Sequence, residues 1–191
     1  MVLSDRDIKQ YLKEGKIKIT PKPDFQTQLG SCSIDLTLGN TFRIYNQSSV
    51  AVIDPYDTTI MDKLTSVVTV RQGEAFVLHP GEFALGITAQ SIALPDDITA
   101  RLEGRSSIGR LGVIIHSTAA IIDAGYYGQI TLELANMGKI PVKLYPGMSI
   151  CSISFETLSS GTEVPYYKKK GAKYLNQKSP EPSKIAEEKR K

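Results

Sequence analysis

Short runs of alternating polar and apolar residues dominate the sequence and limit the folds open to it. In Ser33–Leu38 every second residue is apolar, as in a strand with one buried face. Nine similar runs follow, at Thr41–Tyr45, Ser66–Val70, Ala75–Leu78, Phe83–Thr88, Ile98–Leu102, Val113–His116, Gln129–Leu134, Val142–Leu144 and Ser149–Phe155. Pro80-Gly81 and Pro146-Gly147 are the clearest turns between runs. About ten short strands predict an all-β fold, either an antiparallel barrel or a jelly roll.

One short helix is expected, near the N-terminus. Ser4 is a good N-cap, Asp7 stands at the third helical position and can complete a capping box, and Gly15 ends the helix. Pro21 and Pro23 then stop regular structure. No other segment has helical periodicity, so we expect no second helix.

Length and charge predict one domain followed by a basic arm. The chain has 191 residues, of which 41% are hydrophobic, enough for one core. Residues 168–191 hold nine Lys or Arg and three Asp or Glu, a net charge of +6, whereas residues 1–167 carry −3. We therefore expect a β domain at 1–167 and an arm at 168–191. Basic charge confined to a tail argues against a nucleic-acid surface.

Charge alone leaves two interpretations of the arm open. Its last residues, Glu187–Lys191, are typical of a solvated and partly disordered end. Lys168–Tyr174 combines several ammonium groups with a glycine, so it could fold onto a polyanionic ligand.

The sequence predicts a soluble protein of the reducing cytoplasm. Cys32 and Cys151 belong to no C-x-x-C pair, which excludes a disulfide scaffold and a cysteine-based zinc site. The N-terminus becomes charged at once, so no secretory signal is expected. No apolar run approaches the ~20 residues of a membrane helix.

Arg101–Arg110 is the densest polar segment and predicts a phosphate site. It combines three arginines, adjacent Ser106 and Ser107, and two glycines directly after a predicted strand. Guanidinium forks match phosphate oxygens, and glycines let backbone N–H groups face an anion. The alternative is a surface turn with salt bridges.

Asp123 and Glu133 are the next two carboxylates along the chain, and each has two interpretations that the sequence leaves open. Asp123 follows small residues that leave room for a flat ring, but it could also cap a turn. Glu133 shares one strand face with Gln129 and Thr131, opposite Ile130 and Leu132. If that polar face meets solvent, Glu133 means little; if it lines a pocket, Glu133 can move protons.

Several well-known sites are absent from the sequence. The H-x-E and P-C-x-x-C segments of zinc-dependent nucleobase deaminases do not occur. There is also no Walker-type loop, no G-x-G-x-x-G and no G-x-S-x-G.

Taken in order, these segments resemble the dCTP deaminase family, part of the wider trimeric dUTPase-like group. The matching blocks are Gly104–Arg110, His116–Ala119, Ile122–Gly125, Ile130–Glu133, Pro146–Met148, Pro165-Tyr166 and Ala172–Gln177, with Leu3–Ile8 and Ser33–Gly39 at the front. The resemblance covers nearly the whole chain.

The resemblance implies a distorted dUTPase-like β-barrel or jelly roll in a homotrimer, with pockets shared between neighbours. The implied reaction is hydrolytic deamination of dCTP to dUTP and ammonia, with Mg²⁺ accompanying the triphosphate and no zinc. The resemblance also implies that dUTP can be a second substrate and that dTTP is an inhibitor. No nucleic acid or membrane partner is implied.

The resemblance also assigns roles to residues. Glu133 is similar to the general base, and Arg110 and Ser106 to the pair that poises it and the attacking water. Asp123 would hold the sugar 3′-hydroxyl, and Tyr166 and Gln177 would close the arm over the nucleotide. The implied nucleotide-binding set is Arg105, Ser107, Ile108, Gly109, Ala119, Asp123, Thr131, Leu132, Tyr166, Lys173 and Gln177, with Arg105, Ser107 and Lys173 on the phosphates.

Two sequence cues conflict over a second activity. One branch of the family also cleaves the triphosphate and forms dUMP and pyrophosphate. Single-activity members often carry His-Arg where this chain has Ala120-Ile121, and this favours the dUMP-forming branch. That branch often has Gln where this chain has Ser152, which argues the other way.

A plain dUTPase and a nucleotide-binding regulator remain as less favoured alternatives. A dUTPase usually has Asp at the position of Gly125 and ends in a glycine-rich arm, unlike this chain. A regulator on the same fold would not need Glu133, Ser106 and Arg110 together.

Overall fold

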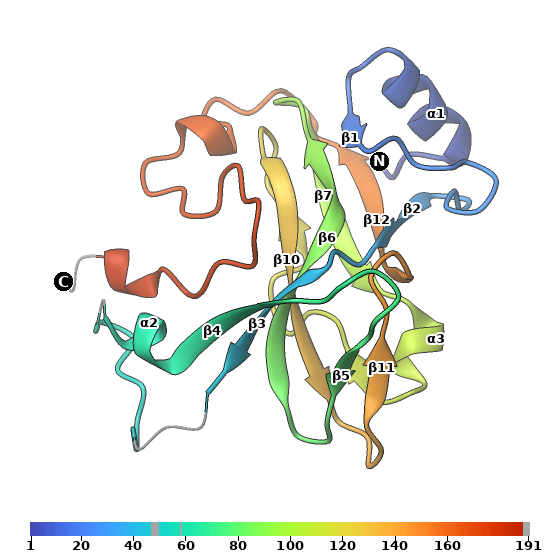
Figure 1. The fold of residues 1–191 in the computed structure, drawn as a ribbon. Coiled ribbons are helices and arrows are strands. Elements are labelled where there is room, and N and C mark those ends of the chain that lie inside the picture. Colours follow the sequence, from blue (N-terminus) through green and yellow to red (C-terminus); the bar gives the residue numbers. More distant parts are fainter. Residues whose placement is uncertain (47–49, 58, 189–191) are drawn as a thin grey trace.

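The computed structural model describes residues 1–46, 50–57 and 59–188 (Figure 1). Its helices are α1 (Asp5–Lys13), α2 (Ile60–Leu64) and α3 (Ser106–Gly109), with 3-10 turns at Tyr166–Lys168 and Ile185–Glu187. Its strands are β1 (Lys18–Thr20), β2 (Ser33–Thr37), β3 (Thr41–Tyr45), β4 (Thr65–Thr69), β5 (Phe76–Leu78), β6 (Phe83–Ala93), β7 (Ile98–Gly104), β8 (Val113–Ile114), β9 (Ile121–Ile122), β10 (Tyr127–Asn136), β11 (Val142–Leu144) and β12 (Ser149–Thr157). Each of the ten predicted runs contains a strand, so the all-β prediction is confirmed.

The strands form two main antiparallel sheets and one small one. The larger sheet has the order β4-β3-β6-β10-β8, with β1 paired to β6. The second has the order β2-β12-β7-β9, and β5 pairs with β11. The sheets do not close into a barrel, so of the two predicted architectures the structure is a distorted jelly roll.

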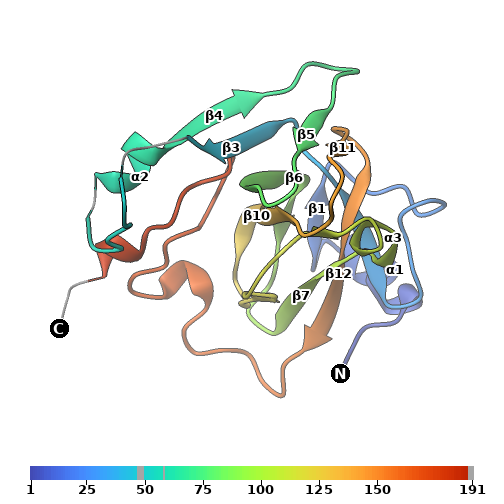
Figure 2. The same ribbon diagram turned by 90° about the horizontal axis from the view of Figure 1, so that it is seen from below.

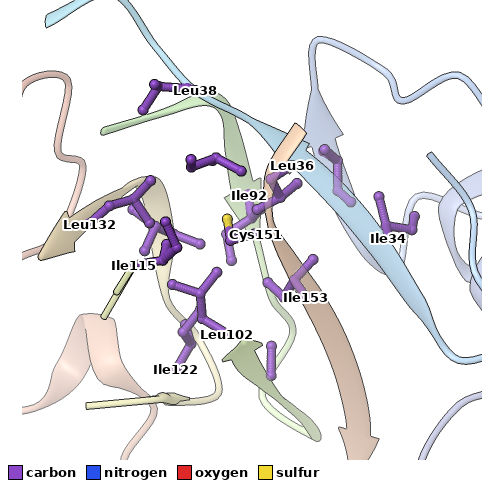
Figure 3. Close-up of a cluster of buried hydrophobic side chains, with 14 of the residues drawn as sticks. Ile34, Leu36, Leu38, Ile92, Leu102, Ile115, Ile122, Leu132, Cys151 and Ile153 are labelled. Atoms are coloured by element: carbon purple, nitrogen blue, oxygen red, sulfur yellow. The ribbon is translucent and has the colours of Figure 1, made fainter. Parts of the chain in front are cut away.

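Both main sheets bury apolar side chains in one core. Leu132 of β10 lies with Leu36, Leu102 and Ile153 of the second sheet around Cys151 (Figure 3). Leu132 and Ile153 are fully buried, and each such side chain contributes about 1.5–3 kcal/mol relative to exposure. Cys151 is itself fully buried, and this burial raises the pKa of its thiol.

The capping box predicted for the first helix is present. The Ser4 hydroxyl accepts the Asp7 N–H at 3.4 Å, and the Asp7 carboxylate accepts the Ser4 N–H at 3.3 Å. Gly15 follows with φ +72°, the left-handed conformation that ends many helices.

The expectation of a single helix is wrong, since α2 and α3 are also helical. Each has five residues or fewer, too short to show a 3.6-residue period in the sequence. In α3 only Ile108 is buried, so its remaining residues resemble a polar loop. The strand β1 was also missed, because only Ile19 is buried in its three residues before Pro21.

The C-terminal segment runs along the larger sheet and reaches α2 (Figures 1 and 2). Its backbone pairs with β10: Asn176 N–H donates to Tyr127 O at 2.8 Å, and Gln129 N–H donates to Gln177 O at 3.0 Å. Arg43 of β3 donates from Nε to Pro180 O at 2.9 Å. The final residues 189–191, expected to be disordered, lie outside the described residues. In the part of the chain that is described, no helix has the length and apolar character needed to cross a membrane.

Candidate active site

A cavity of about 430 Å³ opens between the larger sheet and the C-terminal segment. Six of the site residues predicted from the sequence line it: Ala119, Asp123, Thr131, Glu133, Tyr166 and Gln177. Ala119 lies in the loop after β8, Asp123 follows β9, Thr131 and Glu133 lie on β10, and Tyr166 and Gln177 lie in the C-terminal segment. The fold therefore collects these residues from three separate stretches of sequence.

Glu133 lies in the cavity wall because of the alternation along β10. Its neighbours Leu132 and Leu134 are fully buried in the core, so its own side chain points to the opposite face. The carboxylate is half-buried, and its Oε2 accepts the Ser117 N–H at 2.7 Å. Of the two interpretations of Glu133, the structure supports the pocket.

No cation of the same subunit pairs with Glu133 within the described residues. Its predicted partners are exposed, Ser106 in α3 and Arg110 directly after it, and neither lines the cavity. The predicted contact of Arg110 and Ser106 with Glu133 is therefore not present within one subunit.

Asp123 lies at the mouth of the cavity and has an exposed carboxylate. Lys169 of the arm donates to Asp123 Oδ2 at 3.2 Å. Since both side chains are about half exposed, solvent screens this ion pair, and the carboxylate stays available to a hydroxyl group.

The arm is held against β10 by a buried amide. Gln177 is 4% exposed, and its Oε1 accepts the Thr131 hydroxyl at 3.1 Å. Gly128 allows this close approach: it has φ +135°, and a Cβ there would lie 2.8 Å from the Gln177 nitrogen. Gln177 and Thr131 thus join the arm to the wall of the cavity.

Aromatic rings make up much of the remaining wall. The rings of Tyr126 and Tyr166 lie 5.7 Å apart, centroid to centroid, and the Tyr126 hydroxyl donates to Gln129 O at 2.6 Å. Burial is the main cause that raises the pKa of Tyr126. The Tyr166 hydroxyl accepts the Tyr174 N–H at 3.2 Å.

Sequence reasoning missed several lining residues, among them Tyr45, Phe83 and Tyr174. Tyr174 belongs to the Ala172–Gln177 block and could have been found there. Tyr45 and Phe83 have no local signal, because they are strand-end aromatics whose position depends on long-range pairing.

The other predicted site residues lie outside the cavity. Arg105, Ser106, Ser107, Gly109 and Arg110 belong to α3 or its ends, and α3 and the arm lie on opposite sides of the molecule in both views (Figures 1 and 2). The side chains of Ile108 and Leu132 are buried in the core. The predicted site therefore divides into two groups within one subunit.

Lys173 is also outside the cavity, although it belongs to the arm. Its ammonium pairs with Glu188, and this hydrogen bond is the main cause that raises the pKa of Lys173.

Residues 1–46, 50–57 and 59–188 contain no group of three or more His, Cys, Asp or Glu side chains arranged to bind a metal ion. A Mg²⁺ ion that accompanies a triphosphate takes ligands from phosphate and water, so it does not require such a cluster.

The chain is similar over nearly its whole length to proteins of known name. A protein named dCTP deaminase from Thermomicrobium roseum is 53% identical over 188 residues, covering 98% of this chain and 95% of the other. One named dCTP deaminase, dUMP-forming, from Dictyoglomus thermophilum is 52% identical over 185 residues, covering 97% and 95%.

A solved structure of 2′-deoxycytidine 5′-triphosphate deaminase from Agrobacterium tumefaciens is similar to this fold. It has a TM-score of 0.64 and 25% identity, and the match covers 82% of this chain and about half, 47%, of the other. A family model described as dCTP deaminase-like matches residues 2–158. This chain, with its carboxylate-bearing cavity on a jelly roll, therefore belongs to the dCTP deaminase-like family.

Proposed function

We propose that the protein hydrolyses dCTP to dUTP and ammonia, a step that supplies deoxyuridine nucleotides for pyrimidine synthesis. The observation that carries the proposal is Glu133, half-buried in a cavity shared with Asp123 and Thr131. Relatives that cover nearly the whole chain bear the name of this activity.

The cavity supports a mechanism built on one carboxylate. Glu133 takes a proton as water attacks C4 of cytosine, because neutral water is a weak nucleophile. The carboxyl group passes this proton to N3, then takes the proton of the new C4 hydroxyl and passes it to the departing amine, so water and dCTP give dUTP and ammonia. The Ser117 N–H holds Oε2 and leaves Oε1 available for proton transfer.

We propose that Mg²⁺ enters with the triphosphate and that no zinc takes part in water attack. The missing H-x-E and P-C-x-x-C segments support this scheme. Asp123 binds the 3′-hydroxyl, and Arg105, Ser107 and Lys173 contact phosphate. The remaining nucleotide contacts are Ile108, Gly109, Ala119, Thr131, Leu132, Tyr166 and Gln177, with Leu132 contributing through its backbone because its side chain is buried.

We propose that three chains form the active enzyme. In a homotrimer, α3 of one subunit would complete the cavity of its neighbour and bring Arg110 and Ser106 to Glu133. Exposed apolar residues next to α3 and β8 support an interface there: Leu111 is 55% exposed and Ile114 40% exposed. The proposed location is the cytoplasm, consistent with free thiols at Cys32 and Cys151.

A second activity, cleavage of dUTP to dUMP and pyrophosphate, is favoured by Ala120. This small residue adjoins the cavity-lining Ala119 and leaves space beside the nucleotide. A dUMP-forming relative shares 52% identity, nearly the same as the 53% of a relative named only dCTP deaminase. dTTP is the proposed inhibitor, since it shares the sugar and triphosphate contacts.

The structure weakens the plain dUTPase alternative at Gly125. This residue has φ +80°, and a Cβ there would lie 2.6 Å from the Pro165 Cβ. An Asp at this position would therefore disturb the packing of the arm start.

Product analysis tests these functions. The protein is incubated with dCTP and, separately, with dUTP in the presence of Mg²⁺, and the nucleotides are identified by chromatography. We expect ammonia and dUTP from dCTP; dUMP from either substrate would establish the second activity. No reaction with dCTP would contradict the proposal and favour a nucleotide-binding regulator.

The arm should contribute to substrate affinity. Gln177→Ala removes the buried contact with Thr131, so we expect the KM for dCTP to rise about tenfold, the value of one lost buried hydrogen bond. Lys178→Ala, an exposed change one residue on, is the control. Removal of residues 168–191 should raise KM further, and unchanged KM values would mean that the arm is no lid.

A further inference from the structure

The outer face of the second sheet carries a polar group that the proposed mechanism does not use. Asp35 of β2 and Ser152 of β12 are register partners in antiparallel strands. The Ser152 hydroxyl donates to Asp35 Oδ1 at 2.6 Å. The Asp35 side chain is 18% exposed, so its carboxylate is largely withdrawn from water and needs partners.

Arg105 supplies the second partner. It follows directly after β7 and donates from Nε to Asp35 Oδ2 at 3.0 Å. Its Nη1 also donates to Ser149 O at 3.3 Å. The guanidinium is thereby held on two sides by β2 and β12, while its side chain remains 35% exposed.

We propose that Asp35 and Ser152 are positioning residues that hold the Arg105 guanidinium in place for the substrate triphosphate. This inference rests on the proposed function, in which Arg105 contacts phosphate. A guanidinium has five N–H donors, and those not used by Asp35 and Ser149 can face an anion.

The pairing has a physical cost that makes the proposal testable. A carboxylate beside Arg105 offsets part of its positive charge and weakens its long-range attraction for phosphate. The same carboxylate also restricts the Arg105 side chain before phosphate binds, so that less conformational entropy is lost on binding. If geometry matters more, loss of Asp35 weakens dCTP binding; if charge matters more, its loss strengthens binding.

A double-mutant cycle separates these cases. We expect Asp35→Asn to raise the KM for dCTP about tenfold with kcat changed less than twofold, and Ser152→Ala to act in the same direction but less. In an Arg105→Ala background, Asp35→Asn should add less than twofold, because the group it positions is gone. Asp97→Asn, which breaks the Lys16–Asp97 pair elsewhere on the surface, is the matched control.

A lower KM in Asp35→Asn, or an equal rise in the Arg105→Ala background, would overturn the proposal. If Asp35→Asn fails to fold, Ser152→Ala in both backgrounds gives the same comparison. Calorimetric binding of inorganic tripolyphosphate repeats the cycle without turnover. An inactive wild-type protein that still shows this coupling would contradict the proposed function and leave the positioning role intact.

Discussion

Glu133→Gln is expected to bind dCTP and to release ammonia about a hundredfold to ten-thousandfold more slowly than the wild-type protein. An amide cannot accept the proton of the attacking water, and positioned proton transfer contributes about 10²–10⁴ to such rates. The change keeps the size of the side chain, and its amide oxygen can still accept the Ser117 N–H. Ammonia release and equilibrium binding of dCTP are the two measurements.

Glu156→Gln is the matched control for this variant. Glu156 is also a strand glutamate, but it pairs with Arg101 at 3.1 Å and does not line the cavity. We expect almost unchanged turnover, since partly exposed ion pairs contribute about 0–1 kcal/mol. Turnover by Glu133→Gln close to that of Glu156→Gln would mean that another group is the base.

Glu133 also shows where prediction from the sequence ends. The alternation in Gln129–Leu134 placed the side chain on the face opposite Ile130 and Leu132, and the structure confirms this. The sequence could not decide whether that face meets solvent or a cavity, because the answer depends on the arm. Gln177 contacts Thr131 across 46 residues of sequence, and no local period reports such a contact.

Most strands were predictable from the local alternation of polar and apolar residues. A half-buried strand reveals itself by its period of two, and each of the ten predicted runs contains one. α3 escaped prediction because four residues with one buried member show no period. The block Gly104–Arg110 therefore indicated chemistry, but neither its helical form nor its position outside the cavity that holds Glu133.

Mixed trimers should regain activity from two inactive proteins. Glu133→Gln lacks the proposed base but keeps α3 intact, whereas Arg110→Ala keeps the base and lacks the guanidinium. If each site takes Glu133 from one subunit and Arg110 from the next, a mixed trimer of either composition contains one intact site, about one third of wild-type activity. The cyclic, head-to-tail arrangement of three subunits produces this fraction.

The experiment uses co-expression of the two variants with different tags and purification on both tags. Sedimentation of the product must first show trimers, and the ammonia assay then gives the recovered fraction. Trimers of each single variant, mixed only in the assay, are the control for activity that does not need shared sites. Absence of recovery in verified mixed trimers would mean that Arg110 acts on the Glu133 of its own subunit. That would require α3 to move, because neither Arg110 nor Ser106 lines the cavity that holds Glu133 in one subunit. Recovery near one third would instead explain why Glu133 has no cationic partner among the described residues of a single chain.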